Sequence, residues 1–197
     1  IFIYTDGSCI RLNNIAKAGF GIYIPEKNIK ISKPLLNQKI TNNRAELTSI
    51  IECVDHLDEN DLNKKICIFT DSQYSIYLFT GTGERYEKDG FKNKGVDVPN
   101  IDLIKRLLEL KRTYNIVLLK VRSHTDNKDE HSIGNKIADK LANDGALFSN
   151  KSTVFDINNI SDININELFE LKSKKHSKKC DDIYNDTHNY TYNDLYN

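Results

Sequence analysis

The sequence lacks the features that would place it in a membrane, direct it to secretion or hold a zinc ion. No apolar run among its 197 residues approaches the ~18–20 residues of a membrane span. The first residues lack a basic stretch followed by an apolar one, as a secretory signal has. The four cysteines share no CxxC spacing, which excludes a zinc ribbon. We therefore expect a soluble, intracellular protein with no membrane partner.

The sequence also has no net charge and no methionine. The 28 basic residues balance 28 acidic ones, so no overall positive field attracts a nucleic acid and any binding face must be local. The chain contains no methionine and opens on Ile1, inside a strand-like run. We expect that a segment precedes Ile1 in the natural product.

The spacing of apolar residues predicts an α/β fold. Strand patterns cover residues 1–5, 18–24, 29–32, 65–70 and 115–122. Helical spacing covers residues 43–57, 72–79, 101–113 and 135–148. The order predicts a mixed five-stranded sheet, in which three antiparallel strands precede two further strands, flanked by helices.

Two segments fall outside this pattern. Residues 80–99 carry glycines, mixed charge and two aromatic residues, which predicts a loop or a mobile protrusion. Residues 149–197 are rich in Asn, Asp, Lys and Tyr and predict a low-complexity, mostly disordered tail after a domain at 1–148. The basic cluster at 172–179 suits phosphate contacts, a nuclear address or simply a solvated tail.

Four acidic residues lie where the predicted elements meet. Asp6 and Asp71 follow strands, Glu46 lies in the first turn of a helix, and Asp139 lies in the last helix. Any one of them alone would more often be a cap or a solvated charge. Together, without a cysteine or histidine cage, they favour Mg²⁺ or Mn²⁺ over Zn²⁺. Two such cations can activate water and stabilise the leaving oxygen in phosphodiester hydrolysis.

The sequence around each acid is more specific than its position. The segments are TDGSC at 5–9, TNNRAEL at 41–47, TDSQY at 70–74 and GNKIADKLA at 134–142. In this order they resemble the signature segments of the ribonuclease H family, cellular type 1. The resemblance covers residues 1–148 and implies the ribonuclease H-like fold.

The resemblance also implies an activity. It is that of an endonuclease that hydrolyses the RNA strand of RNA–DNA hybrids without sequence specificity, leaving 5′-phosphate and 3′-hydroxyl ends. Two Mg²⁺ ions, which Mn²⁺ can replace, would be its cofactors, and no small-molecule cofactor is implied. The expected partner is the hybrid, bound by a monomer.

The catalytic residues implied by the resemblance are the metal ligands Asp6, Glu46, Asp71 and Asp139, together with the loop histidine His124. A pKa near neutrality suits histidine for proton transfer. The alternative for His124 is an exposed loop residue without a role. The 14 residues between His124 and Asp139 form a longer and more acidic loop than is usual in the family, which bears on the reach of the histidine.

The substrate-binding residues follow from the same segments. Gly7 and Ser8 offer close backbone approach, and the amides of Asn42, Asn43 and Gln73 can pair with the 2′-OH that distinguishes RNA from DNA. The alternative for Asn42 is an ordinary helix cap without a role in binding. The DNA phosphate pocket of the family maps to Thr41 and Asn100, with Arg44 as a neighbour. Tyr86 and Phe91 stand where the family's DNA-gripping protrusion carries tryptophan, although that segment also reads as a solvated loop.

Three other settings remain open at this point. The chain could be a domain of a larger polyprotein such as a reverse transcriptase. The non-methionine start favours this, whereas the protrusion-like insert at 80–99 argues against it. It could be a hybrid-binding module without activity, against which the four intact carboxylates argue. A transposase-like or integrase-like relative is disfavoured by the amides at Asn42, Asn43 and Gln73.

Overall fold

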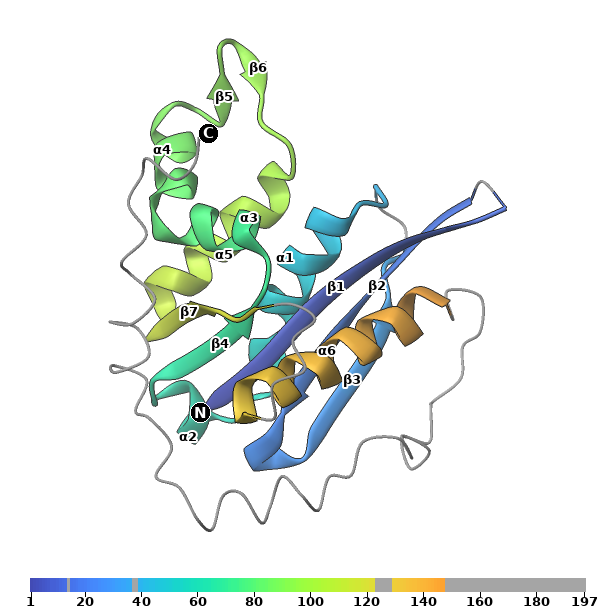
Figure 1. The fold of residues 1–197 in the computed structure, drawn as a ribbon. Helices are drawn as coiled ribbons and strands as arrows, with labels where there is room; N and C mark the ends of the chain where they lie inside the picture. Colours follow the sequence, from blue (N-terminus) through green and yellow to red (C-terminus); the bar gives the residue numbers. More distant parts are fainter. Residues whose placement is uncertain (14, 37–38, 123–128, 148–197) are drawn as a thin grey trace. The chain divides into compact units, whose positions relative to one another are not determined.

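The computed structural model describes residues 1–13, 15–36, 39–122 and 129–147. It contains a five-stranded sheet of order β3-β2-β1-β4-β7 (Figure 1). The strands are β1 (Phe2–Leu12), β2 (Ile15–Ile24), β3 (Ile29–Pro34), β4 (Ile66–Thr70) and β7 (Ile116–Lys120). The first three are antiparallel, whereas β4 runs parallel to β1 and β7 parallel to β4. The predicted mixed sheet is confirmed; the predicted tail at 149–197 and His124 lie outside the described residues.

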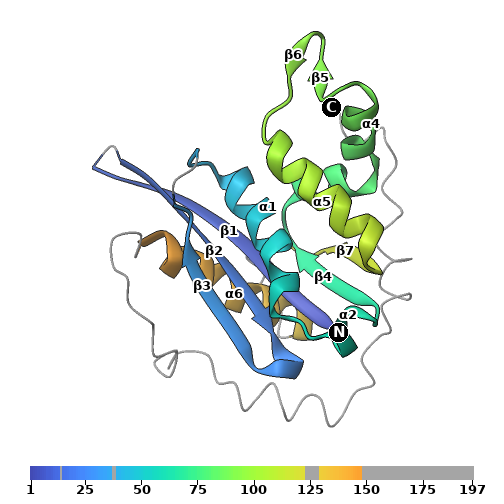
Figure 2. The ribbon, with the colours of Figure 1, turned by 180° about the vertical axis from the view of Figure 1, so that it is seen from behind.

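Helices cover both faces of the sheet. The long ones are α1 (Asn42–Glu52), α5 (Ile101–Thr113) and α6 (Glu130–Leu147). Helix α6 lies on one face, and α1 and α5 lie on the other (Figures 1 and 2). Shorter elements are η1 (Pro25–Lys27), η2 (Cys53–His56), α2 (Glu59–Leu62), α3 (Gln73–Tyr77), η3 (Leu78–Thr82), α4 (Gly83–Lys88), β5 (Lys92–Asn93) and β6 (Val96–Asp97). Within the described part of the chain, no helix is both long and apolar enough to cross a membrane.

The core lies between the sheet and these helices. All five residues of β4 are buried, as expected for a strand covered on both faces. Helix α5 presents a buried stripe at helical spacing, comprising Ile104, Leu107, Leu108 and Leu110. Burying apolar side chains of this size stabilises a fold by roughly 1.5–3 kcal/mol each, before the entropy cost of ordering the chain.

Helix α6 rests directly on the sheet. A Cβ atom at Gly21 would lie 2.2 Å from the carbonyl oxygen of Ala138, so only glycine permits the observed approach. Because Ala138 precedes Asp139, this contact fixes the height of Asp139 above the sheet.

Helix α6 also begins earlier than the predicted residue 135. The carboxylate of Asp129 accepts hydrogen bonds from the backbone N–H groups of His131 and Ser132, at 3.1 and 3.0 Å. This is the arrangement of a helix N-cap. Most of the expected long loop before Asp139 is therefore helix, and that part of the prediction was wrong.

Strand β1 continues well past its predicted end at residue 5. Its parallel pairing with β4 ends at Tyr4 and Phe69, but its antiparallel pairing with β2 runs on to Leu12 and Ile15. The hydrogen bonds to β2 keep the Gly7–Ser8 segment extended. Asp6 consequently lies within a strand and not just past one, which corrects the prediction.

The segment at 80–99 is largely structured. Helix α4 occupies its first part and the β5–β6 hairpin its second, so the loop alternative was wrong there, whereas the mobile protrusion stays a prediction. Ion pairs tie α4 to α5: Lys111 contacts Glu84 at 2.8 Å, and Arg112 pairs with Glu87. Since the partners lie 27 and 25 residues apart, local sequence could not reveal them.

Candidate metal centre

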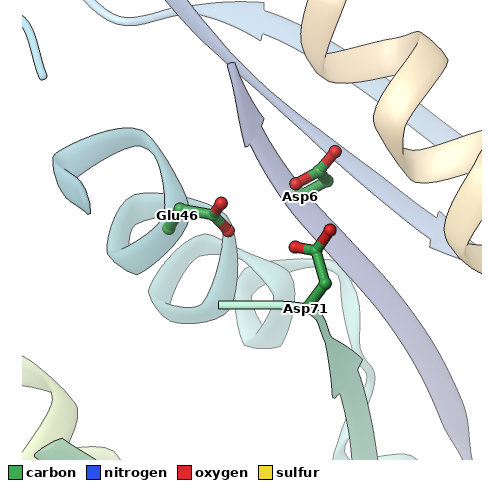
Figure 3. A group of neighbouring side chains, drawn as sticks. All are labelled: Asp6, Glu46 and Asp71. Carbon is green, nitrogen blue, oxygen red and sulfur yellow. The ribbon is translucent and has the colours of Figure 1, made fainter. Parts of the chain in front are cut away.

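Strand register brings two acidic residues together at one end of β4. Tyr4 pairs with Phe69, so Asp6 and Asp71 each stand two residues further along these parallel strands. Glu46 reaches the same point from α1 (Figure 3). One carboxylate oxygen from each of Asp6, Glu46 and Asp71 lies within 4.8 Å of the other two. The three predicted ligands therefore converge.

Close contact between α1 and β1 brings Glu46 to this cluster. A Cβ atom at Gly7 would lie 2.2 Å from the backbone nitrogen of Glu46 and 2.8 Å from its Cα. Helix α1 begins where the hydroxyl of Thr41 accepts a hydrogen bond from the N–H of Arg44, at 3.3 Å. The N-cap is thus Thr41, and Asn42 is not the cap.

Gly7→Ala is expected to push α1 away from β1. Overpacking of this kind costs about 1–3 kcal/mol of unfolding free energy and would also separate Glu46 from Asp6. Thermal unfolding with and without Mg²⁺ measures both effects. Gly19→Ala is the matched control, because its Cβ would meet Ala146 at 2.1 Å, away from the three acids. The control should lose stability but keep its response to Mg²⁺; an equal loss of that response in both variants would contradict the argument.

Burial and mutual repulsion hold protons on this cluster. Burial, followed by the charges of Asp71 and Asp139, raises the pKa of Asp6 to about 8, although the N–H of Gly7 donates to it at 2.8 Å. Burial, followed by the charges of Asp6 and Asp71, raises the pKa of Glu46 to about 9. Crowded carboxylates of this kind disfavour their ionised forms until a cation balances them.

Glu46 also carries a buried oxygen atom without a partner. Its Oε1 accepts a hydrogen bond from the amide of Asn42 at 3.3 Å, whereas its Oε2 has no hydrogen-bond partner among the described residues. A buried carboxylate oxygen left unsatisfied is costly. An oxygen-only donor set with such an atom fits a hard divalent cation.

The fourth predicted ligand, Asp139, neighbours Asp6 from α6. Its charge and its side-chain hydrogen bond both contribute to the raised pKa of Asp6. Its Oδ1 accepts a hydrogen bond from the amide of Asn143 at 3.1 Å. The cluster is therefore bounded by β1, β4, α1 and α6.

The residues predicted to hold a DNA phosphate also meet. Arg44 contacts Thr41 through its backbone N–H and Asn100 through Nη1, the latter at 3.4 Å. Both ends of its guanidinium bind Asp102, at 2.9 and 2.5 Å. Sequence analysis did not single out Asp102, although an acid in the first turn of a helix after Asn100 was visible.

The remaining residues predicted to bind substrate differ in exposure and in their partners. Asn43 is exposed, and the side-chain oxygen of Gln73 accepts a hydrogen bond from Lys120. Tyr86 and Phe91 are half-buried against the core, with the Lys105 ammonium 5.0 Å from the centre of the Phe91 ring. The last two residues therefore serve packing as well as any contact with substrate.

His131 belongs to an aromatic cluster. Its ring stacks on Phe69 with 4.2 Å between centroids, and its Nδ1 lies 3.1 Å from the hydroxyl of Tyr4. Burial lowers its pKa.

Solved structures with the same arrangement define the class of fold. The solution structure of the PFV RNase H domain matches with a TM-score of 0.61 at 25% identity, covering 74% of this chain and 93% of that one. LC9-RNase H1, described as a type 1 RNase H, matches with a TM-score of 0.55 at 21% identity, covering 74% of this chain and 71% of that one. The fold is that of ribonuclease H domains.

Sequence comparison then identifies the family. The RNase H family model matches residues 1–147. The probable ribonuclease H of Acanthamoeba polyphaga mimivirus is 36% identical over 135 residues, which are 66% of this chain and 59% of that protein. The ribonuclease H of Orientia tsutsugamushi is 35% identical over 146 residues, 74% of this chain and 81% of that protein. The chain belongs to the ribonuclease H family, and the predicted resemblance is confirmed.

Proposed function

We propose that the chain is an endonuclease that hydrolyses the RNA strand of RNA–DNA hybrids without sequence specificity. The observation that carries this proposal is the carboxylate cluster of Asp6, Glu46 and Asp71 with its unpartnered Glu46 oxygen. A similar structure supports the substrate: a foamy viral protease–reverse transcriptase described in complex with an RNA/DNA hybrid matches with a TM-score of 0.57 at 26% identity, over 74% of this chain and 20% of that one.

The metal-binding residues in this proposal are Asp6, Glu46, Asp71 and Asp139. Two Mg²⁺ ions, or Mn²⁺ in their place, would supply a water activated for attack and a stabilised leaving oxygen, giving 5′-phosphate and 3′-hydroxyl ends. Asp6 and Glu46 hold their place through buried backbone contacts, whereas Asp71 is only half-buried at the end of β4. Of these three acids, Asp71 is therefore the most accessible to substrate.

Different residues would recognise the RNA strand and the DNA strand of the hybrid. Asn42 is adjacent to Glu46, so its amide stands beside the cluster, where a ribose 2′-OH can be read. Thr41, Arg44 and Asn100 form a polar pocket that suits a phosphate of the DNA strand. Because Asp102 already balances the Arg44 charge, this pocket relies on hydrogen bonds more than on net positive charge. His124, which lies outside the described residues, would assist proton transfer and product release, as the resemblance implies.

A labelled RNA–DNA hybrid incubated with Mg²⁺ beside RNA–RNA and DNA–DNA duplexes of the same sequence tests the proposal. Only the RNA strand of the hybrid should be cut, at internal positions, and the products should carry 5′-phosphate ends. Removal of Mg²⁺ with EDTA should stop cutting, and Mn²⁺ should restore it. Cleavage of all three duplexes alike would rule the proposal out.

A further inference from the structure

Helix α6 and strand β1 are joined by a chain of polar side chains that ends at Asp6 of the metal cluster. The hydroxyl of Ser8 donates to Oδ1 of Asn143 at 2.6 Å, and Nδ2 of Asn143 donates to Oδ1 of Asp139 at 3.1 Å. Asp139 in turn interacts with Asp6. Two residues of the strand and two of the helix thus form one continuous chain of polar contacts.

These contacts can form because residues on one face of the strand and on one side of the helix repeat at nearly the same distance. Residues two apart on a strand lie ~6.7 Å apart and point to the same face, as Asp6 and Ser8 do. Residues four apart on a helix rise ~6 Å along the same side, as Asp139 and Asn143 do. The contact of α6 with Gly21 holds the two rows together. Asp6 therefore has the uncharged Ser8 beside it on β1, and Asp139 has the uncharged Asn143 beside it on α6.

The hydrogen bonds fix which way the Asn143 amide faces. A carboxylate only accepts hydrogen bonds, so Asn143 turns its NH₂ group toward Asp139. Its oxygen then accepts from the hydroxyl of Ser8, which is buried with 8% of its surface exposed. A carboxylate held by such a donor keeps one orientation. Partners that orient metal-binding side chains in this way commonly change metal affinity or activity 10–100-fold when removed.

We propose that Asn143 is a positioning residue that holds the Asp139 carboxylate toward Asp6 and so completes the metal site, with Ser8 setting the orientation of Asn143. This rests on the proposed function, since it assumes that Asp139 binds a metal ion. Neither Asn143 nor the Ser8 hydroxyl touches the reacting atoms in this scheme. Their effect is transmitted through Asp139.

The test compares Asn143→Ala, Asn143→Gln and Ser8→Ala with Lys136→Ala, an exposed truncation on the same helix. Calorimetric titration of each protein with Mn²⁺ gives metal affinity without reference to activity. Asn143→Ala should bind metal about 10–100-fold more weakly. Ser8→Ala should show a smaller loss, and the double variant should be no worse than Asn143→Ala, because the two act in series. Asn143→Gln, which keeps the amide, should recover part of the loss.

Cleavage kinetics supply the second measurement. For Asn143→Ala, kcat should fall and the Mg²⁺ concentration for half-maximal rate should rise, while the KM for hybrid stays near the unaltered value. Unchanged metal titration and kcat in Asn143→Ala, or an equal change in Lys136→Ala, would overturn the inference alone. If the unaltered protein binds no metal and cuts no hybrid, the proposed function fails with it. Should Asn143→Ala not fold, Ser8→Ala and Asn143→Gln decide the matter, since wild-type metal affinity in Ser8→Ala overturns the proposal.

Discussion

Asp71→Asn is expected to lower the rate of RNA cleavage by roughly 10³-fold or more. Removing one carboxylate from a divalent-metal site forfeits several kcal/mol of transition-state stabilisation, and about 4 kcal/mol corresponds to ~10³-fold in rate. Asp71 is only half-buried at the end of β4, so the amide should be accommodated without loss of the fold. Single-turnover cleavage of a labelled hybrid measures the effect on the chemical step.

The matched control for this variant is Asp55→Asn, which makes the same chemical change at an exposed residue of η2. It should cleave at the unaltered rate. Asp71→Asn should also retain affinity for the hybrid, because recognition is assigned to α1 and to the start of α5. Undiminished cleavage by Asp71→Asn, with metal present at ordinary concentration, would exclude the carboxylate cluster as the active site.

The metal-free protein is expected to lose stability as pH rises, and Asp6→Asn is expected to reverse much of that loss. The pKa of Asp6 is about 8 and that of Glu46 about 9 in the folded protein, against ordinary values of 3.8 and 4.5. At pH values between a group's ordinary pKa and its pKa in the folded protein, the folded state holds a proton that the unfolded state has released. The stabilising contribution of each group is therefore complete below pH ~4 and is lost as pH rises through the folded pKa.

Urea unfolding in EDTA at several pH values from 5 to 9 measures this loss. At pH ~8, Asp6→Asn should be more stable than the unaltered protein by about 1–3 kcal/mol, where one pKa unit corresponds to about 1.4 kcal/mol. That gain should raise Tm by roughly 3–10 °C for a domain of this size. Mg²⁺ should flatten the pH dependence of the unaltered protein, because a cation neutralises the same carboxylates. Stability that increases with pH in EDTA across this range would refute the electrostatic account.

The arrangement of the acids could be anticipated to different degrees from the sequence. Asp71 follows an uninterrupted apolar strand, so its place at the carboxyl end of β4 was evident. Asp6 was expected just past a strand end as well, yet the long antiparallel pairing with β2 extends β1 beyond Gly7 and Ser8. Local pattern identifies a residue's element, whereas its position within the element depends on the partner strand.

Contacts between residues far apart in the chain could not be predicted from the local sequence pattern. Asn143 is an unremarkable polar residue in a helix until α6 lies on β1 and brings it to Ser8, 135 residues away. The helix at Gly83–Lys88 likewise makes ion pairs with α5, formed by Glu84 and Glu87. Glycine and mixed charge suggested a loop there because local propensity is weak compared with such tertiary contacts.

The glycine contacts on β1 and β2 have a consequence for how this domain tolerates change. At Gly7 and Gly21 the helices meet the strands main chain to main chain, with no side chain between them. The spacing of the acids is thus set by backbone surfaces that do not depend on the identity of neighbouring core residues. Substituted apolar side chains can be accommodated elsewhere without moving Glu46 or Asp139.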